Sequence, residues 1–323
     1  MKHLVKTTKT FCFLAAFLLI SSASLGQQNS TYLAEQLGYP ADTKFLVVHG
    51  DDLGVTHSKN AASIHAYERG GMNSASIMVP THWFPEIAAY ARENPEFCLG
   101  LHLTLTAEWK YLKWDGVSSS NEISSLLTEE GYMYSTVNDL VENADLTEVE
   151  QELRAQIDRS IEFGIKPTHL DSHMGGPSAT PELFEIMMKL GQEYQIPVRT
   201  TRSQLENPDY RRHVPDYYIV SENTGSLNVN VPAERWNEAY DEIIENLEPG
   251  LNELVVHIAY DNEEMRATTI GHDHWYESAW RQRDYDYVVS QRFRDLLRKH
   301  DITLITWREI QQLMYPGVWQ EDG

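Results

Sequence analysis

The chain is poor in cysteine and in positive charge, and it holds only one strongly apolar run. Its 323 residues include two cysteines, and 26 Lys and Arg stand against 48 Asp and Glu, a formal net charge of −22. Partners such as nucleic acid or anionic lipid require basic patches, so this composition argues against both. A hydrophobic content of 41% with 11% aromatic residues predicts instead a packed globular core.

The apolar run lies near the N-terminus, at Phe11–Ile20. It is far shorter than the roughly 20 residues that span a bilayer, so no stable membrane insertion is predicted. Three lysines precede it and small residues up to Gly26 follow it, which is the pattern of a secretory signal peptide. We therefore expect residues 1–26 to be removed and residues 27–323 to form a single catalytic domain, exported to the periplasm or the medium. Cys98 would then be the only thiol, which excludes an intramolecular disulfide.

Short β-rich runs alternate with longer helical patterns along the rest of the chain. The expected strands are Phe45–His49, Ala75–Val79, Leu99–Leu105, Thr168–Ser172, Val198–Thr201, Leu254–Ala259 and Thr303–Thr306. Helices are expected near 58–70, 84–94, 147–164, 181–195, 233–247 and 286–300. This alternation is typical of βαβ units with parallel strands. Because no glycine-rich phosphate loop is present, we predict an α/β fold with a (β/α) barrel of about seven parallel strands rather than a doubly wound sheet.

Local signals mark two helix starts and two long loops. Thr147-Glu148-Val149-Glu150 has the form of a capping box, and Pro181 suits the first turn of a helix. Segments 107–146 and 202–232 have weaker patterns. We expect them to be long loops over the carboxyl ends of the strands, where (β/α) barrels carry their chemistry.

Polar residues stand at the carboxyl ends of several expected strands. The first strand runs into Asp51 and Asp52, the third contains His102, and a late strand ends at His257. Each signal has an ordinary alternative, because Asp-Asp-x-Gly is also a turn sequence and a lone histidine in an apolar strand is often a core residue. In one parallel barrel, however, these side chains would converge at the same mouth.

A further cluster alternates along the fourth strand, as His169, Asp171 and His173, so that the three share one face. Leaving a carboxylate and two imidazoles unpaired there would cost free energy, and a metal ion removes that cost. Two histidines and one carboxylate with open positions are typical of a catalytic metal site, which lowers the pKa of bound water to about 7. A second carboxylate, Asp51, would then serve as base and His257 as acid.

Taken together, these motifs resemble the YdjC/ChbG-type carbohydrate deacetylases, relatives of the polysaccharide deacetylases. The resemblance extends from Phe45 to Arg308. It rests on Asp51–Gly54, Arg69–Ser76, Gly100–Thr106, Lys166–His173 and the strand that ends at His257. It implies a distorted barrel, similar to glycoside hydrolases and deacetylases, that removes N-acetyl groups from an amino sugar or a short oligosaccharide.

The resemblance also implies roles for single residues. The family's metal ligands fall on Asp52, His102 and His173. Its neighbouring carboxylate falls on Asp51 as the base and its late histidine on His257 as the acid. His169 and Asp171 would orient the ligands by hydrogen bonds. The cofactor would be one divalent ion, with Zn²⁺ favoured by the donor types and Mg²⁺ as the alternative.

The chain departs from the family pattern at two places. His49 stands where the family has Asn or a similar residue, and Met174-Gly175-Gly176-Pro177 stands where it often has further histidines. That loop would lie near the sugar, so the substrate can differ from those of known members. Trp109, Trp275 and Trp280 are candidates for stacking on a sugar ring, with core packing as the alternative.

Two other functions stay open at this point. A carbohydrate esterase or glycoside hydrolase acting on polysaccharide fragments could also use paired carboxylates, although adjacent Asp51 and Asp52 are poorly placed to flank one bond. The second alternative is a non-catalytic, exported sugar-binding protein. The expected partner in every case is an acetylated sugar or oligosaccharide, and the oligomeric state is open, a homodimer included.

Overall fold

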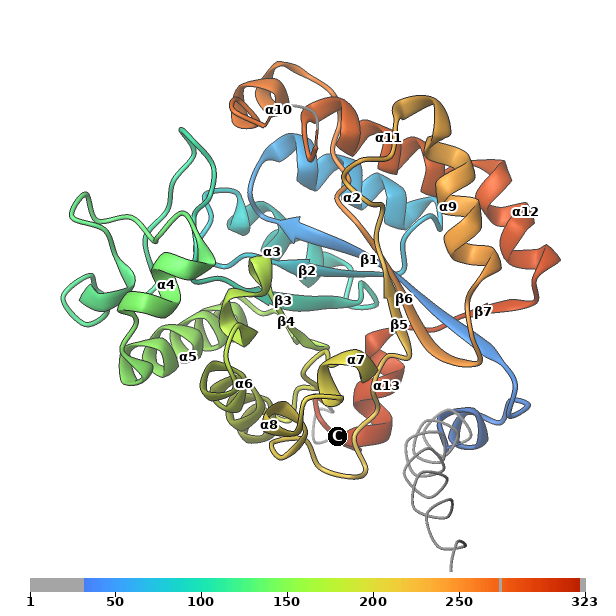
Figure 1. Cartoon of the computed structure of the whole chain (residues 1–323), viewed down its shortest axis with the longest axis horizontal. Helices are drawn as coiled ribbons and strands as arrows, with labels where there is room; N and C mark the ends of the chain where they lie inside the picture. Colours follow the sequence, from blue (N-terminus) through green and yellow to red (C-terminus); the bar gives the residue numbers. More distant parts are fainter. Residues whose placement is uncertain (1–31, 273–274, 320–323) are drawn as a thin grey trace, which may run out of the picture.

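Parallel strands form one curled sheet at the centre of the molecule (Figure 1). The computed structural model describes residues 32–272 and 275–319, so the predicted signal peptide, residues 1–26, lies outside the described residues. The sheet has the order β4-β3-β2-β1-β6-β5, with β7 paired to β1. The strands are β1 (Lys44–Leu53), β2 (Ser74–Ile77), β3 (Leu99–Leu103), β4 (Leu170–Ser172), β5 (Asn223–Gly225), β6 (Gly250–Val256) and β7 (Ile302–Leu304).

The longest strand, β1, organises this sheet. It pairs with β6 from Lys44 to Gly50 on one side, and on the other side with β7 over Lys44–Leu46 and with β2 from His49 onward. Its apolar run, Leu46–Val48, is buried. A strand that is covered on both faces requires such a continuous apolar sequence, and this is why it could be predicted.

Two isolated bridges join the edges of the sheet. Leu170 of β4 pairs with Val198, and Thr201 pairs with Ser221, just before β5. Across these bridges Arg199 N donates to Leu170 O (2.8 Å) and Ser221 N donates to Thr200 O (2.9 Å). Pairing therefore continues from β4 through residues 198–201 to β5, which confirms the predicted α/β fold with a distorted, curled sheet of parallel strands.

Helices cover the outside of the sheet (Figure 1). They are α2 (His57–Glu68), α3 (Phe84–Glu93), α4 (Val137–Asn143), α5 (Leu146–Glu162), α6 (Pro181–Tyr194), α7 (Arg202–Leu205), α8 (Pro208–Arg211), α9 (Trp236–Glu245), α10 (Glu263–Thr268), α11 (Ser278–Val288), α12 (Gln291–Lys299) and α13 (Trp307–Met314), with short 3-10 turns η1 (Ser124–Leu126), η2 (His173–Ser178) and η3 (Ala233–Arg235). The core lies between these helices and the strands. Across the part of the chain that the structure describes, no helix is both long and apolar enough to span a membrane.

Helix boundaries differ from the prediction in two places. Asp145, not Thr147, caps α5, because its carboxylate accepts hydrogen bonds from the N–H groups of Thr147 and Glu148. The predicted capping box is therefore wrong. The predicted helix at 286–300 is two helices, with α12 starting after Ser290, whose hydroxyl caps it. Pro181 does begin α6, as predicted.

Candidate active site

The end of β1 presents two consecutive carboxylates to the same cavity. In a regular strand Asp51 and Asp52 would point to opposite faces. Here the register against β2 shifts between Gly50 and Leu53, and Asp52 has a φ of 62°, in the left-handed region that residues other than glycine rarely adopt. Both side chains therefore line one pocket. The strained backbone at Asp52 marks this turn as a site that the surrounding fold holds in place.

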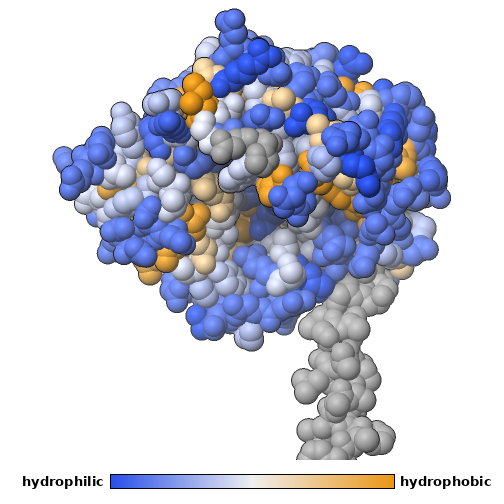
Figure 2. Space-filling model, turned by 45° about the horizontal axis from the view of Figure 1, so that its top comes forward, coloured by the Kyte–Doolittle hydropathy of each residue, from blue (hydrophilic) through white to orange (hydrophobic). Residues whose placement is uncertain are grey.

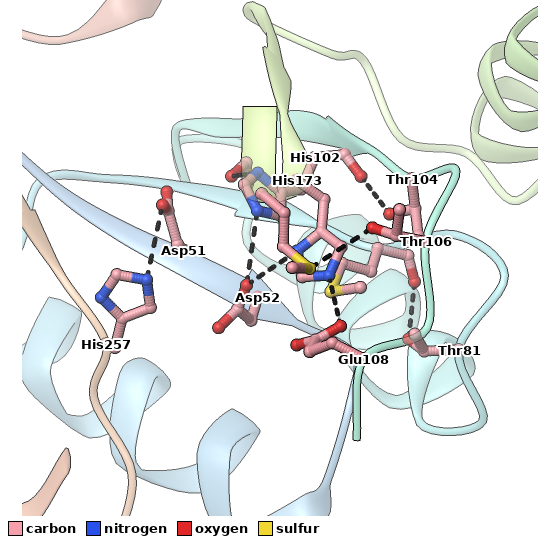
Figure 3. Close-up of polar contacts among 12 residues, drawn as sticks. Asp51, Asp52, Thr81, His102, Thr104, Thr106, Glu108, His173 and His257 are labelled. Carbon is pink, nitrogen blue, oxygen red and sulfur yellow. Dashed lines mark hydrogen bonds and ion pairs between the residues drawn. The ribbon is translucent and has the colours of Figure 1, made fainter. Parts of the chain in front are cut away.

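The three predicted metal ligands converge (Figure 3). His102 Nε2 lies 3.3 Å from Asp52 Oδ1, and His173 Nδ1 lies 3.4 Å from the same oxygen. One donor atom from each residue lies within 4.8 Å of the others, and all three residues are buried. His102 comes from β3 and His173 from the turn η2 directly after β4, so three strand ends build the cluster.

The other nitrogen of each imidazole is held by a carboxylate. His102 Nδ1 donates to Asp171 Oδ1 (2.7 Å), and His173 Nε2 donates to Glu108 Oε2 (2.9 Å). These bonds fix both rings so that His102 Nε2 and His173 Nδ1 face Asp52. Metal-binding histidines in proteins are held in this way, so the residues fit a divalent ion.

Charges around the cluster shift its pKa values. Burial alone would lower the pKa of His173, but the charges of Glu108 and Asp52 outweigh burial and raise it to about 9. Burial opposes ionisation of Asp52, yet Lys59 and the two imidazoles hold its pKa well below the ordinary value. Before a metal binds, the site is thus a set of hydrogen-bonded ion pairs.

Asp171 has the orienting position that was predicted for it. Besides His102, its carboxylate accepts hydrogen bonds from His49 Nε2 (2.9 Å), Ser76 Oγ (2.9 Å) and Arg199 Nη1 (3.0 Å). Despite complete burial, these partners keep its pKa well below the ordinary value. Asp171 therefore stays ionised and holds the His102 ring.

His169 does not make the predicted hydrogen bond to a ligand. Its Nδ1 bonds to Thr168 Oγ1 (3.0 Å), and its Nε2 has no hydrogen-bond partner among the described residues. The ring stacks on Trp307 and lies edge-on to His49. His169 and Asp171 do lie close together, since each offers a donor atom within 4.8 Å of the other, whereas His173 follows the end of β4 in the turn η2.

Asp51 faces His257 (Figure 3), and one of its carboxylate oxygens also lies within 4.8 Å of a ring nitrogen of His102. Its Oδ2 lies 3.8 Å from His257 Nε2, while its Oδ1 lies 3.0 Å from His49 Nε2 and 3.7 Å from Arg199 Nη1. Burial opposes ionisation of Asp51, but the positive charges of His102 and His49 lower its pKa. Burial also lowers the pKa of His257 to about 4, because the nearby carboxylates do not offset it.

The second oxygen of Asp52 contacts two buried cations. Asp52 Oδ2 lies 3.4 Å from Arg281 Nη1 and 3.7 Å from Lys59 Nζ. Lys59 also donates to Ile258 O (3.3 Å), and burial lowers the pKa of its ammonium group to about 7. The Asp52 carboxylate thus lies between the two histidine rings and the two basic side chains.

A pocket of about 650 Å³ opens onto these groups. Figure 2 shows the surface hollowed at the centre of the view, with apolar side chains beside the hollow. Met174 and Trp275 line the pocket and are 46% and 44% exposed, whereas Trp109 lines it as a buried wall. Trp280 was wrongly predicted to bind substrate: it is buried and packs edge-on against Trp236.

Sequence reasoning missed four charged residues of the site. Arg199 lies in the predicted strand 198–201, and its place near a strand end was a usable signal. Glu108, Lys59 and Arg281 carry no motif, because Glu108 follows β3 in an irregular segment and the other two lie on helices. Only the fold brings them to Asp52 and His173.

Comparison with known proteins shows the family of this chain. The model of the YdjC-like protein family matches residues 45–299, and the chain belongs to that family. The carbohydrate deacetylase of Thermus thermophilus is 28% identical over 295 residues, covering 88% of this chain and 99% of that protein. The carbohydrate deacetylase of Brevibacillus brevis is 35% identical over 154 residues, which cover 48% of this chain and 58% of that protein.

A solved structure supports the fold. A candidate cellobiose-phosphate cleavage protein from Enterococcus faecalis superimposes with a TM-score of 0.70 at 24% identity, over 83% of this chain and 99% of that one. The family and the enzyme class predicted from the motifs, a hydrolase of the carbohydrate-deacetylase kind, are confirmed.

Proposed function

We propose that this protein is an exported, metal-dependent deacetylase that hydrolyses the N-acetyl group of an amino sugar or short oligosaccharide. The observation that carries the proposal is the division of contacts between two adjacent carboxylates in one pocket. Asp52 contacts the imidazoles of His102 and His173, whereas the ion pairs of Asp51 are with His49 and His257. Family membership and relatives named carbohydrate deacetylase support the same activity.

The proposed cofactor is one divalent ion held by Asp52, His102 and His173. Such an ion supplies an electrophile for the acetyl carbonyl and an acidified water. Two imidazoles and a carboxylate favour Zn²⁺, with Mg²⁺ as the alternative.

The chain's own residues would move the proton. Asp51 is ionised and lines the pocket with its Oδ2 toward His257, so it would accept a proton from the attacking water. His257, with its pKa near 4, is neutral at pH 7 and must receive a proton before it can donate one. Asp51 Oδ2 lies 3.8 Å from His257 Nε2, so the proton would pass to His257 through a bridging water or after the two groups move closer, and His257 would deliver it to the sugar nitrogen as the C–N bond breaks. The products are acetate and a free amine.

The pocket suits a small sugar. Its volume of about 650 Å³ lies within the range of about 300–1,000 Å³ for sites that enclose small molecules. Exposed Trp275 offers an aromatic face at the mouth, and Met174 an apolar edge. We therefore propose a mono- or short oligosaccharide, with Trp275 stacking on a ring.

The test is acetate release from a panel of acetylated mono- and oligosaccharides. We expect acetate from N-acetylated sugars, loss of activity with a chelator, and recovery on adding Zn²⁺. Reducing sugar released without acetate would indicate a glycoside hydrolase, and faster hydrolysis of O-acetyl groups an esterase. Sugar binding without turnover, unaffected by the chelator, would indicate a non-catalytic binding protein.

The proposed export has its own test. Expression of the full chain in a bacterial host with secretion machinery should yield protein outside the cytoplasm that begins at Gln27, as read by mass spectrometry. Recovery of intact chain beginning at Met1, in the cytoplasm alone, would contradict export but not the enzymatic proposal.

A further inference from the structure

We propose that Arg281 donates a hydrogen bond to the acetyl oxygen of the substrate and to the oxyanion that this oxygen becomes during hydrolysis. The inference rests on the proposed deacetylase function and adds a residue to it. Arg281 lies on α11, in the first turns of a helix that sequence patterns did not predict.

Arg281 is placed at the reacting end of the pocket. Its side chain is 2% exposed and lines the same pocket as Asp51 and His257. Its Nη1 lies 3.4 Å from Asp52 Oδ2, and the other oxygen of that carboxylate contacts both imidazoles. The guanidinium group therefore contacts one oxygen of Asp52, and the two imidazoles contact the other. A carbonyl oxygen that enters the pocket between those donors and Asp51 comes within its reach.

The guanidinium group is also held rigidly. Its Nε donates to Tyr276 O (3.0 Å), and its central carbon lies 5.4 Å from the centre of the Trp109 ring. With Nη1 on Asp52, these contacts fix the plane of the group from three sides. Within the described part of the chain, Nη2 makes no hydrogen bond. A donor that is held in place before the reaction stabilises developing charge without the cost of reorganisation.

Charge balance explains why a second cation stands here. Lys59 already faces Asp52, since its Nζ lies 3.7 Å from Oδ2 and its side chain is fully buried. A further buried cation costs desolvation, and repulsion makes it unfavourable for metal binding at the same carboxylate. In the tetrahedral oxyanion a negative charge forms in the pocket, and a cation beside it stabilises that charge. Arg281 can contact that oxygen, because it lines the pocket.

Lys59 provides the matched control. Its Nζ faces the same oxygen of Asp52, but Lys59 is not among the residues that line the pocket. Lys59→Met and Arg281→Met each remove one buried cation next to Asp52 and keep an apolar stem of similar length. A general effect of charge on the metal site should appear in both variants, whereas a hydrogen bond to substrate is lost in Arg281→Met alone.

The experiment measures Zn²⁺ affinity by competition with a chromogenic chelator, and kcat and KM for acetate release at saturating Zn²⁺. In Arg281→Met we expect kcat to fall at least tenfold, since losing one oxyanion donor typically costs about 10²–10³-fold. We expect KM within threefold of the wild type, and Zn²⁺ bound at least as tightly. Lys59→Met should also keep its Zn²⁺ affinity, with a loss in kcat at least tenfold smaller than that of Arg281→Met.

Three results would overturn the inference: a kcat within tenfold of the wild type in Arg281→Met, equal losses in the two variants, or a loss that disappears when more Zn²⁺ is added. If circular dichroism shows that Arg281→Met is unfolded, Arg281→Lys replaces it under the same thresholds, since one ammonium group cannot reach Tyr276 O, Asp52 and substrate together. A wild-type protein that binds Zn²⁺ but releases no acetate from any sugar would contradict the proposed function itself.

Discussion

Two neighbouring aspartates at the end of β1 have separate partners, and this separation gives them separate roles. Asp52 contacts His102, His173 and two cations, whereas Asp51 contacts His49 and His257. Because the register shift near Asp52 breaks strand alternation, both side chains reach one pocket while their ion pairs differ.

The first prediction follows from this separation. Asp51→Asn should retain the metal and lose about 10²–10⁴-fold in kcat, because a positioned general base contributes that much. Asp52→Ala should bind no metal. Elemental analysis and acetate release from the same preparations check both. Full activity in Asp51→Asn would remove Asp51 from its role, and metal retained in Asp52→Ala would move the binding site elsewhere.

The second prediction concerns His173. Its pKa of about 9 in the metal-free protein lies above the unfolded value of 6.5, so the ring is protonated at pH 7. A metal takes a neutral imidazole at Nδ1, so binding must release that proton. Metal affinity should therefore rise with pH up to about pH 9 and level off above it. Calorimetry at pH 8 in two buffers of different ionisation enthalpy should show release of at least one proton per ion.

Glu108→Gln is the control for this release. It removes the carboxylate that raises the pKa of His173, so fewer protons should be released at pH 8. Metal affinity should also fall about 10–100-fold, the usual effect of losing a carboxylate that orients a metal-binding histidine. Equal proton release in wild type and variant would show that His173 does not carry the proton.

At the scale of elements, α5 holds the start of the loop over the pocket through a buried carboxylate. Glu152 accepts hydrogen bonds from the N–H groups of Val117 and Ser118 (2.9 Å each) and from Gln156 Nε2 (2.8 Å). Gln156 in turn bonds both backbone groups of Thr104, just after β3. This chain of contacts ties loop, helix and strand together.

The third prediction is that Glu152→Gln lowers the free energy of unfolding by about 1–3 kcal/mol, because the new amide group points a donor at another donor in a buried place. Urea denaturation followed by circular dichroism measures it. Glu162→Gln, on the exposed side of the same helix, should change stability by no more than about 0.5 kcal/mol. Equal effects in the two variants would show that the buried hydrogen bonds of Glu152 contribute no more to the free energy of unfolding than the exposed carboxylate of Glu162 does.

Elements with a strong apolar pattern could be predicted from sequence, and others could not. β1, β3 and β6 follow from apolar runs that end in polar residues. β5, Asn223–Gly225, is short and mostly exposed, so nothing in its sequence indicates a strand. The helix α11 buries Arg281 and Asp284 on its inner face, which removes the apolar periodicity that marks a helix.

The same distinction applies to the candidate site. Asp52, His102 and His173 stand at strand ends of one parallel sheet, so strand order alone brings them together. Glu108 and Arg281 join them through the path of a loop and a helix, which only tertiary packing determines. Sequence patterns thus indicate the proposed metal ligands but not the charged residues that surround them.

At the scale of the whole molecule, the three ligands join distant parts of the chain. Asp52 belongs to β1, His102 to β3 and His173 to the turn after β4, and the strands that carry them lie at the centre of the fold. In the unfolded chain these residues are far apart and offer no preformed site. An ion that binds only the folded protein stabilises all of it.

The fourth prediction is therefore that metal binding raises global stability. At a free Zn²⁺ concentration of about 100 times Kd the gain is about 2.7 kcal/mol, if the unfolded chain does not bind. Thermal unfolding should shift upward with Zn²⁺ and return on adding a chelator, and the shift should be absent in Asp52→Ala. A Zn²⁺-dependent shift of equal size in that variant would mean that the stabilising ion lies outside this cluster. No shift in the wild type would mean that the three side chains meet for a reason other than a metal.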